Sequence, residues 1–262
     1  MSKGTYEGDI DEIKFVKRFN EFKNLFTNYT SKFCENNNYW MVRVTTKQLS
    51  KLSNQKVFTR ADAYLAKFSI DIKSLLIRNN YYLTEDLLNK NNIEYKKIPY
   101  SGISVKMTDS ANFQILKVGP HSFSVLFNNY ELGAGASLFC LRENELVKNK
   151  ALIDGWKTTP QRMANFFNEF TNGDENFHMD QEICKKIKNF SCKQIENLIN
   201  NSKDLQEKIF NGKDLYEEPY TAWYFYHGET IESLITIPFS VTTGSGRSHG
   251  DYTIVLKPIN RS

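Results

Sequence analysis

Apolar and polar positions alternate along the chain with periods that predict a helix, then strands, then more helices, then strands again. Near the N-terminus, four phenylalanines recur at steps of four, three and four residues: Phe15, Phe19, Phe22 and Phe26. This spacing predicts one face of a helix over about residues 9–29. Glu12 lies three residues before Phe15, so its side chain continues the apolar stripe. Either this acid has a function, or it lies at a helix start that water still reaches.

Three short, mostly apolar stretches predict strands: residues 39–44, 61–66 and 103–107. The second stretch carries a single carboxylate, Asp62, among apolar neighbours. In the third, Ser104 and Lys106 point to the same side, because alternate residues of a strand share a face. Between these strands, a helix is expected at about residues 82–92, with Thr84 as its N-terminal cap.

The second half of the chain has segments of both kinds. Residues 113–118 and 122–127 are compatible with either a strand or a helix, whereas about 160–210 is mostly helical, with breaks at Gly173 and at 189–191. The remaining predicted elements are a short basic helix at about 46–52 and strands at 222–226, 233–237 and 252–256. This order of helices and strands predicts a mixed α/β or α+β fold.

Composition restricts the class of protein further. The chain has 262 residues, of which 40% are hydrophobic and 14% aromatic, enough for a sizeable core, so disordered, collagen-like and coiled-coil proteins are excluded. The net charge of +4 is mildly basic, which is compatible with binding nucleic acid. No apolar run reaches the roughly 18–20 residues of a membrane helix, and the first residues lack a signal-peptide core. We therefore expect a cytoplasmic protein without a membrane partner.

Four cysteines occur without a C-x-x-C pair: Cys34, Cys140, Cys184 and Cys192. This spacing favours buried free thiols over a zinc site. The glycine-rich run Gly133–Ser137 lacks the lysine and the spacing of a phosphate-binding loop, so close packing or a turn is the preferred interpretation. A nucleotide-binding enzyme built on this run is the alternative. The four histidines have no metal-ligand spacing.

Asp62 together with Ser104, Val105 and Lys106 is the set most informative about chemistry. A metal-dependent phosphodiesterase needs a carboxylate to hold a divalent ion, and a lysine that orients the attacking water and offsets phosphate charge. Adjacent strands lie about 4.8 Å apart, so Asp62 and Lys106 on neighbouring strands would face the same ion. Glu12 would then complete the site from the first helix. The structural alternative is that Asp62 only accepts from a backbone amide and Lys106 only protects a sheet edge.

These residues resemble the core of the PD-(D/E)XK nucleases, in particular the bacterial type II restriction endonucleases. The matching segments are Gly8–Glu12, Thr59–Tyr64 and Ile103–Lys106, within about the first 110 residues. The resemblance implies an α/β (mixed α+β) fold with a central mixed β-sheet flanked by helices, which cleaves DNA with Mg²⁺. It implies a catalytic core over 1–150, followed at 151–262 by a helical segment and a β-rich DNA-recognition region, in one continuous domain.

Carried over by position, the resemblance assigns Asp62 and Glu12 to the metal, with the main-chain carbonyl near Val105 as a further ligand. Lys106 matches the catalytic lysine, and Ser104 stands at the acid position of the D/E-x-K element. Two departures are present. Ala61, not proline, precedes Asp62, and the serine at position 104 leaves the second metal carboxylate to Glu12, or to Glu94 or Glu131.

The polar, glycine-rich loop 242–251 is the best candidate for contact with DNA. Its glycines permit close approach of the backbone to phosphate. The predicted DNA-binding residues are Ser245, Arg247, Ser248 and His249. A guanidinium such as that of Arg247 forms a bidentate pair with a guanine edge. Lysines between Lys185 and Lys193 either follow the DNA backbone or form a solvated helix face.

From these features we expect a Mg²⁺-dependent type II restriction endonuclease that hydrolyses double-stranded DNA at a short specific sequence. A homodimer suits a palindromic site, and a cognate DNA methyltransferase is the expected genetic partner; both follow by analogy with the resembled family. The alternative function is a non-catalytic nucleic-acid-binding protein that uses basic helices and exposed aromatic side chains.

Overall fold

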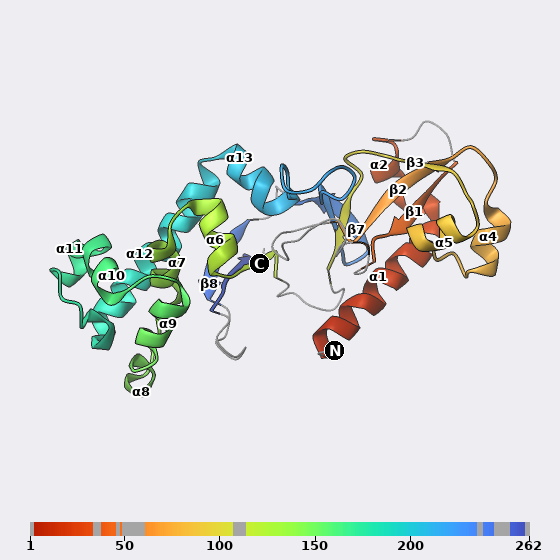
Figure 1. Ribbon diagram of the computed structural model, residues 1–262. Helices are drawn as coiled ribbons and strands as arrows, with labels where there is room; N and C mark the ends of the chain where they lie inside the picture. Colours follow the sequence, from red (N-terminus) through yellow and green to blue (C-terminus); the bar gives the residue numbers. More distant parts are fainter. Residues whose placement is uncertain are drawn as a thin grey trace. The chain divides into compact units, whose positions relative to one another are not determined.

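The protein folds into two compact units, each built from two separate stretches of the chain (Figure 1). The structure is a computed structural model that describes residues 3–33, 38–45, 48, 61–106, 114–234, 238–243 and 252–259. The first unit comprises Met1–Phe113 with Glu207–Ile237, and the second Gln114–Gln206 with Pro238–Ser262. The expected mixed α+β class is confirmed. The expected division at residue 150 differs from the observed one and falls within helix α9 (Asn149–Gly155).

The first unit contains the larger sheet and the helices that cover it. Its helical elements are α1 (Lys3–Glu21), η1 (Lys23–Phe26), α2 (Thr27–Thr30), α4 (Lys73–Arg78), α5 (Glu85–Lys90) and the single π-turn η3 (Glu207–Asn211). Its strands are β1 (Tyr39–Arg43), β2 (Ala63–Phe68), β3 (Tyr95–Lys97), β4 (Ile103–Val105), β6 (Tyr224–His227) and β7 (Thr230–Ser233).

The sheet is mixed, with strand order β1-β2-β4-β6-β7 and with β3 also paired to β2. All neighbours are antiparallel except β4 and β6, which run parallel with Ile103 opposite Tyr224. A parallel pair requires a long crossover between its two strands. Here the crossover from β4 to β6 contains Gln114–Gln206, the longer of the two stretches that form the second unit. This pairing explains why the unit boundaries do not follow the sequence halves.

Two hydrophobic clusters cover the two faces of this sheet, so its central strands are buried on both sides. On one face, Met41 and Leu65 pack with Phe15 and Phe19 of α1 and with Phe26 and Tyr29. On the other face, Trp40, Val42 and Tyr64 pack with residues of α4 and α5. All five residues of β1 are buried, as expected for a strand enclosed between two helical layers.

The first helix is shorter at its C-terminal end than its phenylalanine spacing predicts. It ends at Glu21, and Phe26 reaches the core from the separate turn η1. Phe22 lies at the junction and is 47% exposed. The predicted helix cap is confirmed, because Thr84 Oγ1 accepts a hydrogen bond from Leu87 N at 3.2 Å at the start of α5.

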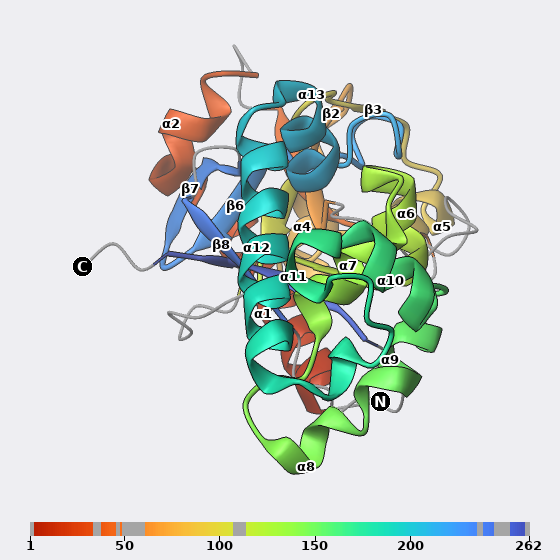
Figure 2. The same cartoon turned by 90° about the vertical axis from the view of Figure 1, so that its left-hand side faces the viewer.

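The second unit packs helices against a smaller sheet. Its helical elements are α6 (Pro120–Phe127), α7 (Tyr130–Ser137), α8 (Glu143–Leu146), α9 (Asn149–Gly155), α10 (Pro160–Phe166), α11 (Asn168–Thr171), η2 (Phe177–Met179), α12 (Gln181–Asn200) and α13 (Lys203–Gln206). Three antiparallel strands form the sheet in the order β5-β9-β8: β5 (Leu116–Val118), β9 (Ile254–Pro258) and β8 (Phe239–Thr243). Helix α12 runs beside α7, which contacts β8 and β9 (Figure 2).

Helix α7 is the buried centre of the second unit. A Cβ on Gly133 would lie 2.2 Å from the ring of Trp156, and one on Gly135 would lie 2.4 Å from Ser191 Oγ. The glycine-rich run Gly133–Ser137 therefore allows close helix packing, which confirms the preferred interpretation and leaves the nucleotide-binding alternative without support. The predicted break at 189–191 is wrong, because these residues lie inside α12.

Three cysteines are free thiols, and none of them lies in a disulfide: Cys140 and Cys184 are buried, and Cys192 is half-buried. Cys34 lies outside the described residues. None of the helices in the described part of the chain combines the length and hydrophobicity needed to cross a lipid bilayer.

Gly102, just before β4, provides a test of the packing that positions the strand. A Cβ at this position would lie 1.8 Å from the Thr221 carbonyl oxygen, 2.7 Å from that of Pro219 and 2.9 Å from the Ala61 Cβ. Because backbone atoms cannot move aside like a flexible side chain, Gly102→Ala is expected to lower the free energy of unfolding by about 3 kcal/mol. Urea denaturation followed by circular dichroism measures this loss.

Gly119→Ala is the matched control, since the nearest atom to its added Cβ would be the Tyr252 carbonyl oxygen at 4.0 Å. This variant should change the free energy of unfolding by less than about 1 kcal/mol. Equal stability of the two variants would contradict the close approach of backbone at Gly102.

Candidate functional site: carboxylates and a lysine at the ends of β2 and β4

Asp62 lies directly before β2 and is held by the neighbouring strand β4. Its Oδ2 accepts a hydrogen bond from the backbone N–H of Val105 at 2.8 Å and from the hydroxyl of Ser104 at 3.1 Å. The backbone N–H of Asp62 donates in turn to the Ile103 carbonyl at 2.8 Å. These bonds fix the carboxylate against the end of β4. Its other oxygen, Oδ1, accepts no hydrogen bond from the residues that the structure describes.

Lys106 follows β4 directly, and its backbone N–H donates to the Tyr226 carbonyl at 2.9 Å. Ser104 and Lys106 alternate with Ile103 and Val105, which belong to the hydrophobic cluster on the α1 face. The side chains of Ser104 and Lys106 therefore start from the opposite face, as the strand period predicts. The Lys106 ammonium forms no hydrogen bond or ion pair with any described residue.

Glu12 approaches this end of the sheet from α1, which covers the face opposite to the one from which Ser104 and Lys106 start. Its Oε2 accepts two hydrogen bonds from Arg43, the last residue of β1, at 2.8 Å from Nε and 2.6 Å from Nη2. Arg43 Nη2 also pairs with Asp9 Oδ1 at 2.6 Å, and Nη1 donates to the Tyr82 hydroxyl at 3.2 Å. Glu12 thus continues the apolar stripe, as predicted, and has a buried ionic partner there. As with Asp62, one oxygen of Glu12 is held, while Oε1 accepts nothing from the described residues.

The ionisable groups of this region influence one another. Burial raises the pKa of Glu12 to about 7; the negative charge of Asp62 adds to the rise, and Arg43 opposes it. Burial lowers the pKa of the Lys106 ammonium, and the charges of Asp62 and Glu12 offset only part of that effect. The charge of Asp62 thus acts on both Glu12 and Lys106.

The donor set fits a hard divalent cation. Each of the two carboxylates has one oxygen fixed by the protein and a second that no described residue engages, and carboxylate oxygen is the ligand that Mg²⁺ prefers. No group of three or more His, Cys, Asp or Glu side chains suited to a metal occurs in the described part of the chain. A Mg²⁺ ion is commonly held by one or two carboxylates with water and substrate phosphate, so this smaller set is sufficient.

Of the other two suggested acids, Glu94 lies elsewhere in the first unit, and Glu131 is engaged within the second unit. Glu94 is exposed and precedes β3, which pairs with the far end of β2, about 20 Å along the strand from Asp62. Glu131 belongs to the second unit, where its Oε1 accepts from Thr158 at 2.8 Å and pairs with Arg162 at 2.7 Å. Of the two suggested acids in the first unit, Glu12 is therefore the one that interacts electrostatically with Asp62.

Two features of the first unit escaped the sequence analysis. The sequence analysis treats Arg43 only as part of the predicted strand 39–44. A lone charge at the end of an apolar strand is nevertheless the same signal that indicates a role for Asp62. The second feature is a buried cluster in which Glu85 Oε1 accepts from Tyr64, from Tyr220 at 2.8 Å and from Lys97 at 2.9 Å. Burial alone would raise the pKa of Glu85, but these three donors outweigh it and hold the pKa below its usual range.

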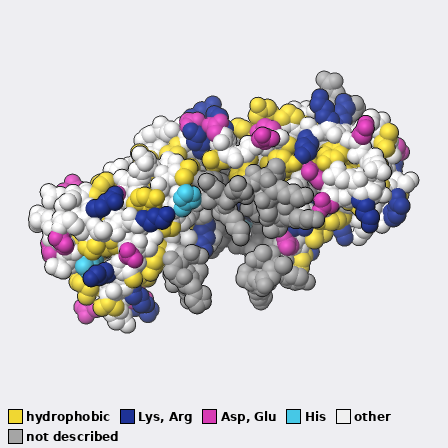
Figure 3. Space-filling view, in the orientation of Figure 1, with side chains coloured by type: hydrophobic (Ala, Val, Ile, Leu, Met, Phe, Trp, Pro, Cys, Tyr) yellow, Lys and Arg dark blue, Asp and Glu magenta, His cyan; other side chains and the backbone are white. Residues whose placement is uncertain are grey.

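The predicted DNA-contacting residues, Ser245, Arg247, Ser248 and His249, lie outside the described residues, as does most of the basic helix predicted at 46–52. On α12, Lys185, Lys186 and Lys193 are exposed, whereas Lys188 is half-buried. On the described part of the face shown in Figure 3, basic and acidic side chains are interspersed and form no continuous basic surface.

Comparison with known proteins identified no relative of this chain. No family model matches it, and neither the curated proteins nor the solved structures include a significant match. The proposed chemistry of Asp62, Glu12 and Lys106 therefore rests on the geometry of this chain.

The raised pKa of Glu12 gives a direct test of this geometry. In carbon-13 NMR titrations of the metal-free protein, the Glu12 carboxyl should titrate near pH 7, and Glu12→Gln should remove that signal. Asp62→Asn should lower the Glu12 pKa, because the negative charge that raises it is removed. A Glu12 pKa that is unchanged in Asp62→Asn would contradict the proximity of the two carboxylates.

The same shift predicts how stability changes with pH. Between pH 4.5, the usual pKa, and about 7, folded Glu12 retains a proton that the unfolded chain has released. The contribution of Glu12 to the free energy of unfolding therefore falls as the pH rises through this window. Urea denaturation at a series of pH values should show a smaller fall for Glu12→Gln than for the unmodified chain.

Proposed function

We propose that this protein is a Mg²⁺-dependent endonuclease of the type II restriction class, which hydrolyses phosphodiester bonds of double-stranded DNA. The observation that carries the proposal is the fixed position of Asp62 against the strand end that bears Lys106. A carboxylate and an ammonium group that share one small region, with a second carboxylate from α1, match the needs of phosphodiester hydrolysis. The mixed sheet between two helical layers supports the resemblance to the PD-(D/E)XK nucleases without establishing membership.

Each group has a distinct task in this mechanism. Asp62 Oδ1, Glu12 Oε1 and the main-chain carbonyl of Val105 would hold the ion. Bound Mg²⁺ would supply Lewis-acid stabilisation of the charge that develops on the scissile phosphate. Lys106 Nζ, which no described residue engages, orients the attacking water by hydrogen bonding and offsets the phosphate charge. The water oxygen bonds to phosphorus as the bond to the 3′ oxygen breaks, which leaves a 5′-phosphate and a 3′-hydroxyl.

Ser104 has a supporting task where the resembled family has an acid. Its hydroxyl donates to Asp62 Oδ2, so it holds the first carboxylate and adds no charge of its own. Glu12 then supplies the second carboxylate from α1. Arg43 fixes that carboxylate and, because it pairs with both Glu12 and Asp9, limits the excess of negative charge around the ion.

Recognition of DNA is assigned in this proposal to the loop that contains Ser245, Arg247, Ser248 and His249. A homodimer that cuts both strands of a palindrome, and a cognate methyltransferase that protects the host DNA, belong to the same proposal by analogy. A cytoplasmic location follows from this function.

Cleavage of plasmid DNA tests the assignment of Asp62 and Lys106. Asp62→Asn and Lys106→Ala should each lower the rate of Mg²⁺-dependent cleavage by about 100-fold or more, because each removes a group that acts on the reacting phosphate or water. Discrete fragments, resolved on agarose gels, are expected from a sequence-specific enzyme.

Asp71→Asn and Lys67→Ala are matched controls, since both side chains are exposed in the same unit and outside the candidate site. They should cut at the unmodified rate. Full activity of Asp62→Asn or Lys106→Ala would remove that residue from the mechanism. DNA binding without cleavage under any Mg²⁺ concentration would favour the non-catalytic nucleic-acid-binding alternative.

Arg43 provides a test of how Glu12 is positioned. Arg43→Met should raise the Mg²⁺ concentration needed for half-maximal cleavage by about tenfold, because residues that orient metal ligands typically contribute this much to metal affinity. The maximal rate at saturating Mg²⁺ should fall less than the affinity. Arg78→Met, at an exposed position on α4, is the control and should change neither quantity.

A further inference from the structure

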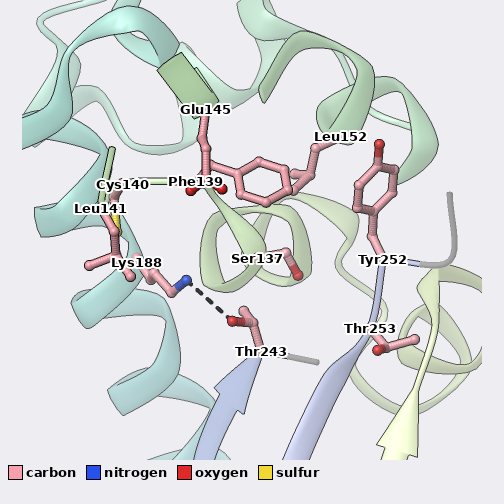
Figure 4. A pocket seen from close by; sticks show the side chains of 10 residues that line it. All are labelled: Ser137, Phe139, Cys140, Leu141, Glu145, Leu152, Lys188, Thr243, Tyr252 and Thr253. Carbon is pink, nitrogen blue, oxygen red and sulfur yellow. Dashed lines mark hydrogen bonds between the residues drawn. The ribbon is translucent and has the colours of Figure 1, made fainter. Parts of the chain in front are cut away.

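The second unit contains a cavity of about 200 Å³ that the proposed nuclease chemistry does not use (Figure 4). It lies between the end of α7, helix α12, the end of β8 at Thr243, and Tyr252 and Thr253, which precede β9. All the residues that line it belong to this one unit. The cavity therefore depends on no contact between the units.

Three polar groups at the cavity have unused hydrogen-bonding capacity. Ser137 is 7% exposed, and its buried hydroxyl oxygen has no hydrogen-bond partner among the described residues. Lys188 Nζ donates to the Leu138 carbonyl at 3.1 Å and to Thr243 Oγ1 at 3.3 Å, so one of its three N–H groups has no acceptor among the described residues. The Glu145 carboxylate forms no hydrogen bond or ion pair with the described residues. A buried polar atom without a partner requires an explanation, and a bound ligand supplies one.

Aromatic rings supply the apolar part of the lining. Phe139 and Tyr252 both contribute their rings to the cavity (Figure 4). A Cβ on Gly155 would lie 2.7 Å from the Tyr252 ring, so the absence of a side chain there lets the ring lie against α9. Rings held in this way favour a flat ligand, because planar groups stack on aromatic side chains.

Size and chemistry together restrict the ligand. An apolar cavity of about 150 Å³ holds benzene, so about 200 Å³ accommodates one planar ring system and not a complete nucleotide. The ligand must also offer N–H donors to Glu145 and acceptors to Lys188. Guanine does both, since its ring and exocyclic N–H groups suit a carboxylate, and its O6 and N7 suit an ammonium group.

We propose that this cavity binds a single guanine base. The base comes either from a free nucleoside or from a nucleotide that has left the stack of a DNA strand, as enzymes that extrude bases require. The Glu145 carboxylate accepts from the base, Lys188 donates to it, and the rings of Phe139 and Tyr252 bound its plane. This site goes beyond the proposed nuclease function and does not depend on it.

Isothermal titration calorimetry in the presence of EDTA tests the cavity as a binding site. EDTA removes Mg²⁺, so the proposed DNA cleavage does not contribute to the measured heat. Guanosine should bind with a dissociation constant at least tenfold lower than that of thymidine. Glu145→Gln should weaken guanosine binding by about tenfold, the size expected for the loss of a charged hydrogen-bond acceptor. Glu143→Gln, an exposed neighbour on the same short helix, is the matched control and should leave binding unchanged.

Two oligonucleotides distinguish the sources of the base: a thymine 9-mer and the same 9-mer with one central guanine. Tighter binding of the second, reduced by Glu145→Gln, identifies a base presented by a DNA strand. Selective binding of guanosine alone identifies a free-nucleoside site. Absence of guanine selectivity in both experiments, or equal losses in Glu145→Gln and Glu143→Gln, would overturn the proposal. Asp62→Asn should retain guanosine binding, so failure of the nuclease proposal remains distinguishable.

Discussion

The candidate site depends on the pair of hydrogen bonds from Val105 N–H and the Ser104 hydroxyl to one oxygen of Asp62. They join the start of β2 to the end of β4, and β4 leads directly into Lys106. Because one oxygen of the carboxylate is held, its second oxygen keeps a defined direction. A metal ion needs ligands that are oriented in this way. Without this contact, the two strand ends would carry the same residues but no common site.

A balance of charges accompanies this contact. Asp9, Glu12 and Asp62 bring three carboxylates to one end of the sheet, and Arg43 and Lys106 bring two cations. Arg43 is bound on several sides, whereas no described residue engages the Lys106 ammonium. This difference separates a structural cation from one that remains available for chemistry. The raised pKa of Glu12 has the same origin, since burial and a neighbouring carboxylate both disfavour its charge.

The candidate site of the first unit and the cavity of the second unit are formed in different ways. In the first unit, helices cover both faces of the sheet. The polar side chains of the candidate site lie at the ends of the strands, where backbone pairing stops. In the second, the glycines of α7 let Trp156 and α12 approach closely. The cavity beside the end of that helix has aromatic side chains in its lining, and its Ser137 hydroxyl has no partner among the described residues. The first arrangement suits phosphate chemistry, and the second suits the recognition of a flat ligand.

Several elements were determined by local sequence alone. Strands β1, β2 and β4 and the cap at Thr84 follow from side-chain period and local hydrogen bonding, which need no distant partner. The sequence also predicts that Asp62 lies next to the strand that leads into Lys106, and Asp62 contacts Ser104 and Val105 of that strand. Helix breaks were less predictable: Asn189 and Ser191 suggested an end, yet packing of α12 against α7 stabilises a continuous helix.

Only the tertiary structure decided which distant residues meet. Arg43 pairs with Glu12 because β1 packs against α1, a contact between residues 31 positions apart that no local pattern encodes. The parallel pairing of β4 with β6 assigned Glu207–Ile237 to the first unit and separated the second. Side-chain period depends on neighbours along the chain, whereas pairing of strands and burial of charges depend on the free energy of the whole fold.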